Sequence, residues 1–274
     1  MNKHSDDFYC AAIKNIYQNS WSIRKPLVQG GVCPLFLVDT PDGTKVCRFG
    51  EKEMVARNKL VSDLLTFHDI PVPYTRTHAF LDMYFESYDY CADKTLYEHI
   101  LSGMPSKAVD NVYNQVFDIQ RRISQIPASD FMPDAGRTWT DVFSICKKMV
   151  IPASLVEVYS VMFRLFADSG KLRLLHNDVN PKNLLVDDKG NLTKLIDLDC
   201  ITMCNESFSV FLMIKRAKPE KRIEILKNYE KIVGRSVNNK AILTAARAFD
   251  AMKYPIDVMH SAFWRGYQEK QHYK

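Results

Sequence analysis

Apolar and polar positions alternate in short runs through the first third of the chain. Residues 21–28, 35–39 and 45–49 show this alternation, and Pro41-Asp42-Gly43 separates the last two runs. A period of two indicates strands, and a cluster of Pro, Asp and Gly is typical of a tight turn. We therefore expect a hairpin-rich antiparallel sheet, completed by one further extended stretch over residues 78–88.

Helical periodicity follows these strands. Residues 51–67 carry apolar side chains close to a 3.6-residue spacing, and Ile70-Pro71-Val72-Pro73 then stops the helix. After residue 95 the pattern is mainly helical, interrupted by one β-rich segment over 173–199. The other helices that the pattern predicts cover residues 7–17, 95–101, 106–125, 138–149 and 152–168, with several more beyond 207.

These elements predict an α+β fold with two lobes. Residues 1–88 form a small antiparallel β lobe in this prediction, and residues 89–274 form a larger, mainly helical lobe. A connector near residues 86–93 joins them. The 274 residues, 46% of them hydrophobic, are enough to build a substantial core.

The composition argues against a membrane-spanning, secreted, disulfide-rich or zinc-binding protein. The longest nearly apolar run, residues 208–214, is far shorter than the roughly 20 residues of a membrane span. The first residues lead into no apolar segment typical of a secretory signal. Seven scattered cysteines form no CxxC pair, which is typical of neither a disulfide framework nor a zinc site. We expect reduced thiols and a cytoplasmic location.

Charge is distributed unevenly along the chain. The net charge is +5, but residues 201–274 contain 14 Lys and Arg against 7 Asp and Glu, a net +7, so that the first 200 residues carry −2. No recognised nucleic-acid motif accompanies the basic segment. We therefore interpret it as a solvated helical surface and expect no nucleic-acid partner.

The segment richest in candidate chemistry lies in the β-rich stretch. Leu174-Leu175-His176-Asn177-Asp178 leads through a loop to Asn183, and Leu195-Ile196-Asp197-Leu198-Asp199 follows a turn. Phosphoryl transfer needs charge neutralisation and positioning, and magnesium prefers oxygen ligands. An Asp and an Asn can hold the metal, while a separate Asp can accept the proton of an attacking hydroxyl.

The spacing H-x-D-x-x-x-x-N, with a further Asp on a following strand, matches a kinase catalytic loop. Asp and Asn beside Pro are also common turn residues, and an isolated D-x-x-x-x-N would carry no information. Here the loop lies between two apolar strands and Ile196-Asp197 ends the next hairpin. The combination favours a phosphate-transfer site.

This segment resembles the motif of the aminoglycoside phosphotransferase and choline/ethanolamine kinase superfamily, H-[GN]-D-x-x-x-x-N followed by I-D-[FWL]-[DE]. The His-Asn-Asp form is closer to choline kinases. The resemblance implies a protein-kinase-like fold, ATP and Mg²⁺ as cofactors, and a small-molecule acceptor. It implies that Asp178 is the catalytic base, that Asn183 and Asp197 bind metal, that Asp199 has a secondary role, and that His176 orders the loop.

The first third agrees with this resemblance. Gly30 and Gly31 stand between two predicted strands, and glycines let backbone N–H groups approach phosphate closely. Val46-Cys47-Arg48-Phe49-Gly50 resembles the family's third strand, where a cation reaches the nucleotide phosphates. The resemblance implies that role for Arg48, with Lys45 as a weaker candidate. Residues 86–90 correspond to the backbone that contacts adenine, which implies nucleotide contacts for Glu86 and Tyr88.

One departure from the family concerns the helix after the third strand. A Glu on this helix should orient the strand cation, but the register places Asn58 there. Glu53 lies one turn or more away and is the candidate substitute; otherwise the ion pair is missing. A catalytically weak nucleotide-binding protein is therefore an alternative to an active kinase. A protein kinase ranks last, because the chain has no Asp-Phe-Gly and no following Ala-Pro-Glu.

The acceptor stays open at this point. Few acidic residues after position 200 oppose its many basic ones, which disfavours a polycationic aminoglycoside without removing that alternative. Choline would need an aromatic cage, whereas a sugar or an amino alcohol derivative would not. The aromatic residues that could form such a cage, but more often pack in a core, are Phe249, Tyr254, Phe263, Trp264 and Tyr267.

Overall fold

The computed structural model describes residues 5–20, 22–25, 33–131, 166, 172–215 and 217–250. The chain divides into two compact units. The first unit combines residues 1–136 with 180–201, and the second combines residues 137–179 with 202–274. The division into lobes at residue 88 stays a prediction.

A five-stranded sheet dominates the first unit, in the order β1-β2-β3-β5-β4 with every neighbouring pair antiparallel. This confirms the sheet that the alternating pattern predicts. The strands are β1 (Ser22–Arg24), β2 (Leu35–Thr40), β3 (Gly43–Gly50), β4 (Arg76–Phe80) and β5 (Met83–Asp89).

The extended stretch expected over residues 78–88 is instead a hairpin of β4 and β5. Phe80 pairs with Met83, so that only Leu81 and Asp82 make the turn. Leu81 lies in the left-handed region with φ 54°, which glycine or asparagine usually occupies. Neither glycine nor asparagine stands in this turn, and the sequence pattern therefore did not predict the hairpin.

One face of the sheet packs against helix α1 (Asp6–Ile16). Tyr9, Ala12 and Ile13 of the helix are buried in a cluster with side chains of β2, β3 and β5. The rings of Tyr9 and Phe49 lie 4.6 Å apart, centroid to centroid. Because side chains alternate across a strand, the residues between these apolar ones point to the opposite face, where the polar site lies.

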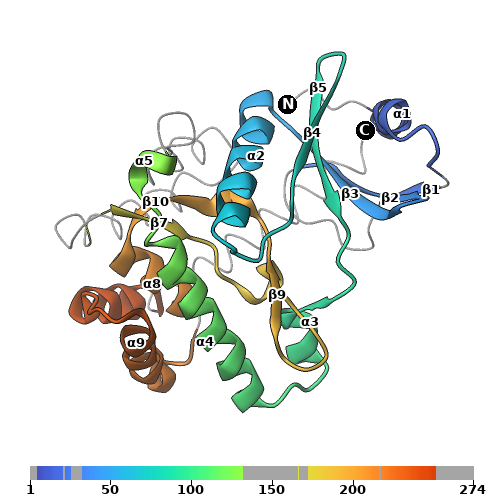
Figure 1. The fold of residues 1–274 in the computed structure, drawn as a ribbon. Helices are drawn as coiled ribbons and strands as arrows, with labels where there is room; N and C mark the ends of the chain where they lie inside the picture. The colour runs from blue at the N-terminus through green and yellow to red at the C-terminus, as the bar shows by residue number, and fades with distance from the viewer. Residues whose placement is uncertain are drawn as a thin grey trace, which may run out of the picture. The chain divides into compact units, whose positions relative to one another are not determined.

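Helix α2 (Lys52–Phe67) is in contact with β3, β4 and β5 in the first unit (Figure 1). Its buried face includes Val55, Val61 and Leu65, which reproduces the predicted helical period. Ser62 fixes the chain that returns from the helix, because its hydroxyl donates to Pro73 O at 2.8 Å and accepts from the Thr75 N–H at 2.9 Å.

The rest of the first unit supports a second, three-stranded sheet in the order β6-β8-β9. A capping box of Thr95 and Glu98 starts α3. Gln115 of α4 accepts the Leu192 N–H at 3.0 Å and so joins that helix to β9. The elements are β6 (Lys94–Thr95), α3 (Leu96–Leu101), α4 (Ser106–Ile123), α5 (Ala128–Phe131), β8 (Leu184–Val186) and β9 (Leu192–Leu195).

The second unit contains paired strands β7 (Leu172–His176) and β10 (Ile201–Asn205), the first residue of β10 belonging to the first unit. Helices α8 (Glu206–Ile214) and α9 (Pro219–Val233) follow, and residues 239–250 are also helical. The helices predicted over 138–149 and 152–168 lie outside the described residues, apart from Phe166.

An aromatic core holds the second unit together. Phe166 lies 5.5 Å from Phe208 and 5.9 Å from Phe211 between ring centroids, and Phe211 lies 6.4 Å from Phe249. All four are buried, so Phe249 is part of the core. The other aromatic residues considered for a cage, at positions 254, 263, 264 and 267, lie outside the described residues.

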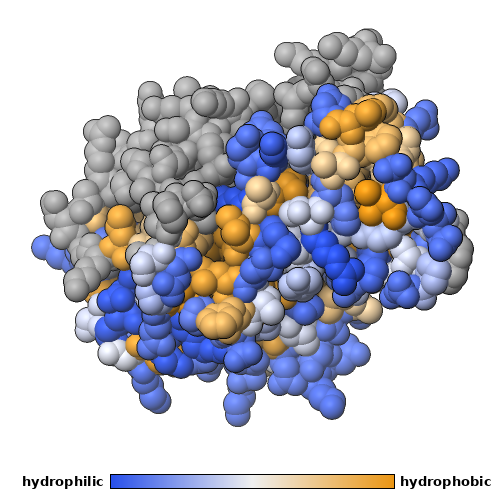
Figure 2. All heavy atoms as spheres, turned by 45° about the horizontal axis from the view of Figure 1, so that its top comes forward, coloured by the Kyte–Doolittle hydropathy of each residue, from blue (hydrophilic) through white to orange (hydrophobic). Residues whose placement is uncertain are grey.

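Polar and apolar residues are interspersed on the face of the molecule shown in Figure 2. Phe67 and Leu81 are the most exposed of the large apolar side chains that the structure describes, at 82% and 73%. Single exposed apolar residues of this kind are ordinary on protein surfaces. In the described part of the chain, no helix has both the length and the apolar character needed to span a membrane.

Candidate functional site

Strand register places Arg48 opposite Glu86. The two residues are direct partners in the β3–β5 ladder, so their side chains leave the same face of the sheet. This face is opposite to the one that α1 covers. Lys45, the weaker candidate for a phosphate contact, lies at an odd number of residues from Arg48 and therefore points to the other face, where it pairs with Asp89 at 2.5 Å.

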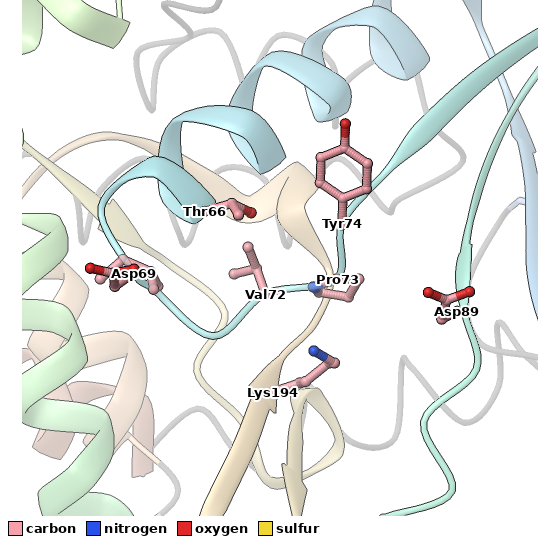
Figure 3. A pocket seen from close by; sticks show the side chains of 8 residues that line it. Thr66, Asp69, Val72, Pro73, Tyr74, Asp89 and Lys194 are labelled. Carbon is pink, nitrogen blue, oxygen red and sulfur yellow. The ribbon is translucent and has the colours of Figure 1, made fainter.

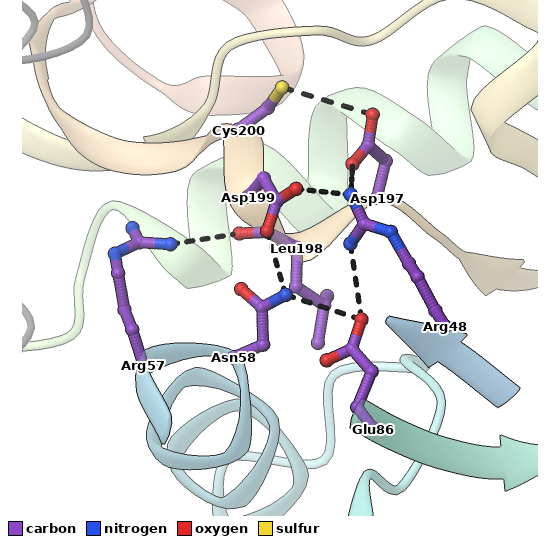
Figure 4. A network of polar contacts seen from close by, with 8 residues as sticks. All are labelled: Arg48, Arg57, Asn58, Glu86, Asp197, Leu198, Asp199 and Cys200. Atoms are coloured by element: carbon purple, nitrogen blue, oxygen red, sulfur yellow. Dashed lines mark hydrogen bonds and ion pairs between the residues drawn. The ribbon is translucent and has the colours of Figure 1, made fainter. Parts of the chain in front are cut away.

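Three carboxylates surround the Arg48 guanidinium (Figure 4). Nη1 lies 3.1 Å from Glu86 Oε1, while Nη2 contacts Asp199 and lies 3.8 Å from Asp197 Oδ1. Burial by itself lowers the pKa of Arg48, but Asp199, Glu86 and Asp197 together raise it above the ordinary value. Three carboxylates against one guanidinium leave an excess of negative charge, which suits a divalent cation.

Glu86 is the most deeply buried of these carboxylates, with 3% of its surface exposed. Burial raises its pKa to about 6, although Arg48 opposes the shift. Its backbone lies inside the sheet, paired with Arg48 on one side and Thr77 on the other. The position of Glu86 therefore differs from the adenine-contacting backbone expected from the sequence, and its side chain is a partner of Arg48.

Asn58 of α2 bridges two of the three carboxylates (Figure 4). Its Nδ2 donates to Asp199 Oδ1 at 2.7 Å and to Glu86 Oε1 at 3.3 Å. Asn58 is fully buried. Glu53, the candidate substitute for the missing helix carboxylate, is exposed and makes no ion pair within the described residues. The amide at position 58 is thus the contact between α2 and the acidic cluster.

Arg57, next to Asn58, holds the backbone that carries Asp199. Its guanidinium donates to Leu198 O at 3.3 Å and to Ile201 O. Arg57 is only 4% exposed and lies over the ring of Phe131 at 5.8 Å. The sequence pattern does not reveal this residue, because a single Arg in an amphipathic helix is ordinarily interpreted as solvent-facing. No short-range signal marks its contacts with Leu198 and Ile201, which lie more than 140 positions away.

The hairpin of β8 and β9 brings Asn183 close to Asp197. Leu184 pairs with Leu195, and the Ile196 N–H donates to Asn183 O at 3.0 Å. Asn183 ends the 3₁₀ turn Pro181–Asn183, and Asp197 precedes a second such turn, Leu198–Cys200. One amide and one carboxylate at the same end of a hairpin, beside the acidic cluster, are a donor set that fits magnesium.

Asp197 has a backbone conformation that is rare outside glycine. Its φ of 67° and ψ of 64° lie in the left-handed region, which costs a residue with a Cβ about 1–2 kcal/mol and which Asp tolerates better than most. The backbone reverses at this position and directs the Asp197 and Asp199 carboxylates towards Arg48. Local strain of this kind is common at functional sites.

Asp178 belongs to the second unit, in the loop that follows β7. Its side chain is exposed, and its backbone N–H donates to His176 Nδ1 at 3.2 Å. His176 is fully buried. Asn177 secures the loop from the other side, since its Nδ2 donates to Thr202 Oγ1 at 2.8 Å. The loop-ordering role of His176 stays a prediction, with the Asp178 N–H as the contact through which it would act.

Two other predicted nucleotide contacts have different outcomes. Gly30 and Gly31 lie outside the described residues. Tyr88 is half-buried and projects from the same face of β5 as Glu86, and burial raises its pKa. Strand β4 begins opposite Ser87, so β4 does not pair with the backbone of Tyr88. A nucleotide contact at Tyr88 stays a prediction.

An open pocket of about 370 Å³ lies elsewhere in the first unit (Figure 3). The segment from Thr66 to Tyr74 forms most of its wall, and Asp89 and Lys194 complete it. None of the residues that the sequence predicts for catalysis or metal binding lines this pocket. We therefore assign the candidate site to the Arg48 cluster and not to this pocket.

Solved structures with the same fold include several phosphotransferases. An aminoglycoside 3'-phosphotransferase of type VIII has 14% identity and a TM-score of 0.66, over 90% of this chain and 99% of its own. Aminoglycoside 2'-phosphotransferase-IIIa, in a GDP complex, has 15% identity and a TM-score of 0.63, over 94% and 93%. A macrolide 2'-phosphotransferase from Brachybacterium faecium has 16% identity and a TM-score of 0.57, over 94% of both chains.

At these identities the likeness shows the fold alone, and it confirms the α+β, kinase-like class predicted from the sequence. No curated protein matches the chain. The model of the family described as "Phosphotransferase enzyme family" matches residues 28–205. This match covers well over half of the chain and includes Arg48, Asn58, Asp178, Asn183 and Asp197, and the protein therefore belongs to the phosphotransferase enzyme family.

Proposed function

We propose that the protein transfers the γ-phosphoryl group of a magnesium-bound nucleoside triphosphate to a hydroxyl group of a small molecule. The observation that carries this proposal is the cluster around Arg48, where a partly buried cation lies beside Asp197 and Asp199 at the end of the β9 strand. A cation for phosphate oxygens and acidic groups for metal are the two requirements of phosphoryl transfer. Family membership supports the same reaction.

Each residue has a defined role in this proposal. Asn183 and Asp197 hold Mg²⁺, which neutralises charge on the phosphates when it is bound. Arg48 binds the nucleotide phosphates, and Asp199, which contacts its guanidinium, has a secondary role. Asp178 accepts the proton of the acceptor hydroxyl as the new O–P bond forms and the bond from the γ-phosphorus to the bridging oxygen breaks. The nucleoside diphosphate is the leaving group.

The acceptor class follows from charge. The segment after residue 200 carries +7, which opposes a polycationic acceptor on Coulomb grounds. We propose a neutral, singly charged or anionic hydroxyl compound, such as a sugar or a choline- or ethanolamine-like alcohol. Aminoglycosides and macrolides are the alternative, because proteins with this fold act on them.

The direct test is a screen for nucleotide consumption. Purified protein with Mg²⁺ is offered ATP or GTP together with choline, ethanolamine, sugars, aminoglycosides and macrolides, and phosphorylated products are identified by mass spectrometry. A product that forms with the wild type and not with Asp178→Asn supports the proposal. If the wild type binds MgATP or MgGTP but phosphorylates none of these acceptors, a catalytically weak nucleotide-binding protein is the better description.

A further inference from the structure

The cation of a kinase-like third strand is ordinarily oriented by a carboxylate from the neighbouring helix. In this chain the helix position holds Asn58, whose amide cannot form an ion pair. The Arg48 guanidinium nevertheless has a buried carboxylate 3.1 Å away, from Glu86. The carboxylate is supplied by a strand and not by the helix.

The neighbours of Glu86 suit it to this role. Glu86 is the direct partner of Arg48 in the β3–β5 ladder, so the main-chain pairing of two central strands fixes the separation of their side chains. Its Oε1 accepts from both Arg48 and Asn58. Among the described residues no donor reaches its Oε2, although this atom is buried. Removing the Arg48 contact would leave a costly buried charge.

Of the three carboxylates around Arg48, Glu86 is the one outside the predicted metal-binding segment. Asp197 and Asp199 lie in that segment, two positions apart. Glu86 comes from β5, and the sequence predicts no metal-binding role for it. It can therefore keep Arg48 in the same orientation whether or not Asp197 is engaged by a metal.

The identity of residue 58 is consistent with this arrangement. Asn58 donates its amide hydrogens to Glu86 and Asp199 at once. A carboxylate at position 58 would be the fourth around the Arg48 guanidinium. It would lie within hydrogen-bond distance of the Glu86 and Asp199 carboxylates, and like charges so close together repel strongly where they are buried. With Glu86 present, position 58 requires a neutral donor.

We propose that Glu86 is the positioning residue that holds Arg48 for the nucleotide phosphates, in place of the missing helix carboxylate, with Asn58 as a neutral bridge between Glu86 and Asp199. This inference rests on the proposed function, since it assumes that Arg48 binds a phosphate. Arg48 and Glu86 lie on adjacent strands of one sheet, so a displacement of α2 would not separate them.

The test compares Glu86→Gln with Glu53→Gln as the matched control, because Glu53 is the exposed glutamate of the same region. Affinities for MgATP, MgADP and adenosine are measured by calorimetry on the full chain. We expect Glu86→Gln to weaken MgATP binding about tenfold or more, the usual scale for a charge-assisted contact. Adenosine, which has no phosphate, should bind to the variant and the wild type equally, and Glu53→Gln should match the wild type throughout.

A carboxylate returned to the helix gives a second, independent measurement. Asn58→Glu alone should weaken MgATP binding, because it adds a fourth carboxylate. The double variant Asn58→Glu/Glu86→Gln restores the original charge and should bind MgATP more tightly than either single variant. A merely structural role of Glu86 would produce no such rescue.

The outcomes separate the two proposals. If the wild type binds neither MgATP nor MgGTP, the proposed function fails and this inference fails with it. If the wild type binds MgATP and Glu86→Gln binds it within twofold, only the inference is wrong. Equal losses for MgATP and adenosine would also overturn it. Should Glu86→Gln unfold, Glu86→Asp, which keeps the charge and shortens the side chain, is measured in its place with the same expectations.

Discussion

Arg48 and Glu86 face each other across two antiparallel strands, with 3.1 Å between Nη1 and Oε1. They are separated by 38 positions in the chain, and Asn58 lies between them in sequence and beside Glu86 in space. This relationship gives the strand cation a carboxylate partner in a chain whose helix lacks one. It also weakens the case for an inactive protein, which depended on that missing residue.

The proposed base predicts a loss confined to the chemical step. Asp178→Asn should lower the rate of phosphoryl transfer by about 10²- to 10⁴-fold, since a positioned general base contributes on that scale. The affinity for MgATP should change little, because Asp178 is assigned to the acceptor hydroxyl. Steady-state kinetics with the acceptor found in the screen, together with calorimetry for MgATP, measures both quantities. A variant that keeps the wild-type turnover, or one that loses MgATP binding, would contradict the assignment.

The predicted metal ligand should control the requirement for magnesium. Asp197→Asn removes a carboxylate oxygen, and we expect the Mg²⁺ concentration for half-maximal nucleotide binding to rise by at least about tenfold. Asp188→Asn is the control, because Asp188 is an exposed carboxylate in the turn between β8 and β9. An unchanged magnesium requirement in Asp197→Asn would exclude Asp197 as a ligand.

The shifted pKa of Glu86 predicts opposite effects of pH on stability and on binding. The folded protein holds the Glu86 proton with a pKa of about 6, above the ordinary value of 4.5. As the pH falls from about 6 through 4.5, the wild type should therefore gain about 2 kcal/mol of stability relative to Glu86→Gln. Over the same range MgATP binding should weaken, because protonation removes the charge that holds Arg48.

Denaturant unfolding and nucleotide titration at several pH values measure these two quantities. Glu86→Gln lacks the titrating carboxyl group. Neither the gain in stability nor the loss of MgATP affinity that comes from Glu86 should therefore occur in this variant. A constant difference in stability between the two proteins from pH 7 to pH 4.5 would show that Glu86 is not perturbed.

His176 should act through the loop that carries Asp178. His176→Ala deletes a fully buried side chain and the acceptor of the Asp178 N–H, and we expect about 1–3 kcal/mol of lost stability. Turnover should fall while MgATP affinity is kept. His176→Asn, whose amide oxygen can replace Nδ1 as acceptor, should recover part of the turnover. Equal turnover in the Ala and Asn variants would argue against this hydrogen bond.

Within the described residues, the sequence pattern located most of the strands and helices, and the hairpin between Asn183 and Asp197, with small errors at their ends. The helices predicted over 138–149 and 152–168 lie outside those residues. The sequence pattern missed the β4–β5 hairpin, because the turn residues Leu81 and Asp82 include no glycine, asparagine or proline. It placed Glu86 in a backbone contact with adenine, since only the order of elements was available. It suggested Glu53 as the partner of Arg48, which the register of β3 and β5 assigns to Glu86.

The sequence by itself determined the chemistry within short stretches of chain: the spacing of Asp178 and Asn183, the acidic pair after β9, and the periods that distinguish strand from helix. These features depend on local geometry, which a few neighbouring residues specify. Only the tertiary structure decided which side chains meet Arg48. Contacts such as that of Asn58 with Asp199, 141 positions apart, depend on strand register and helix packing, which many weak interactions set together.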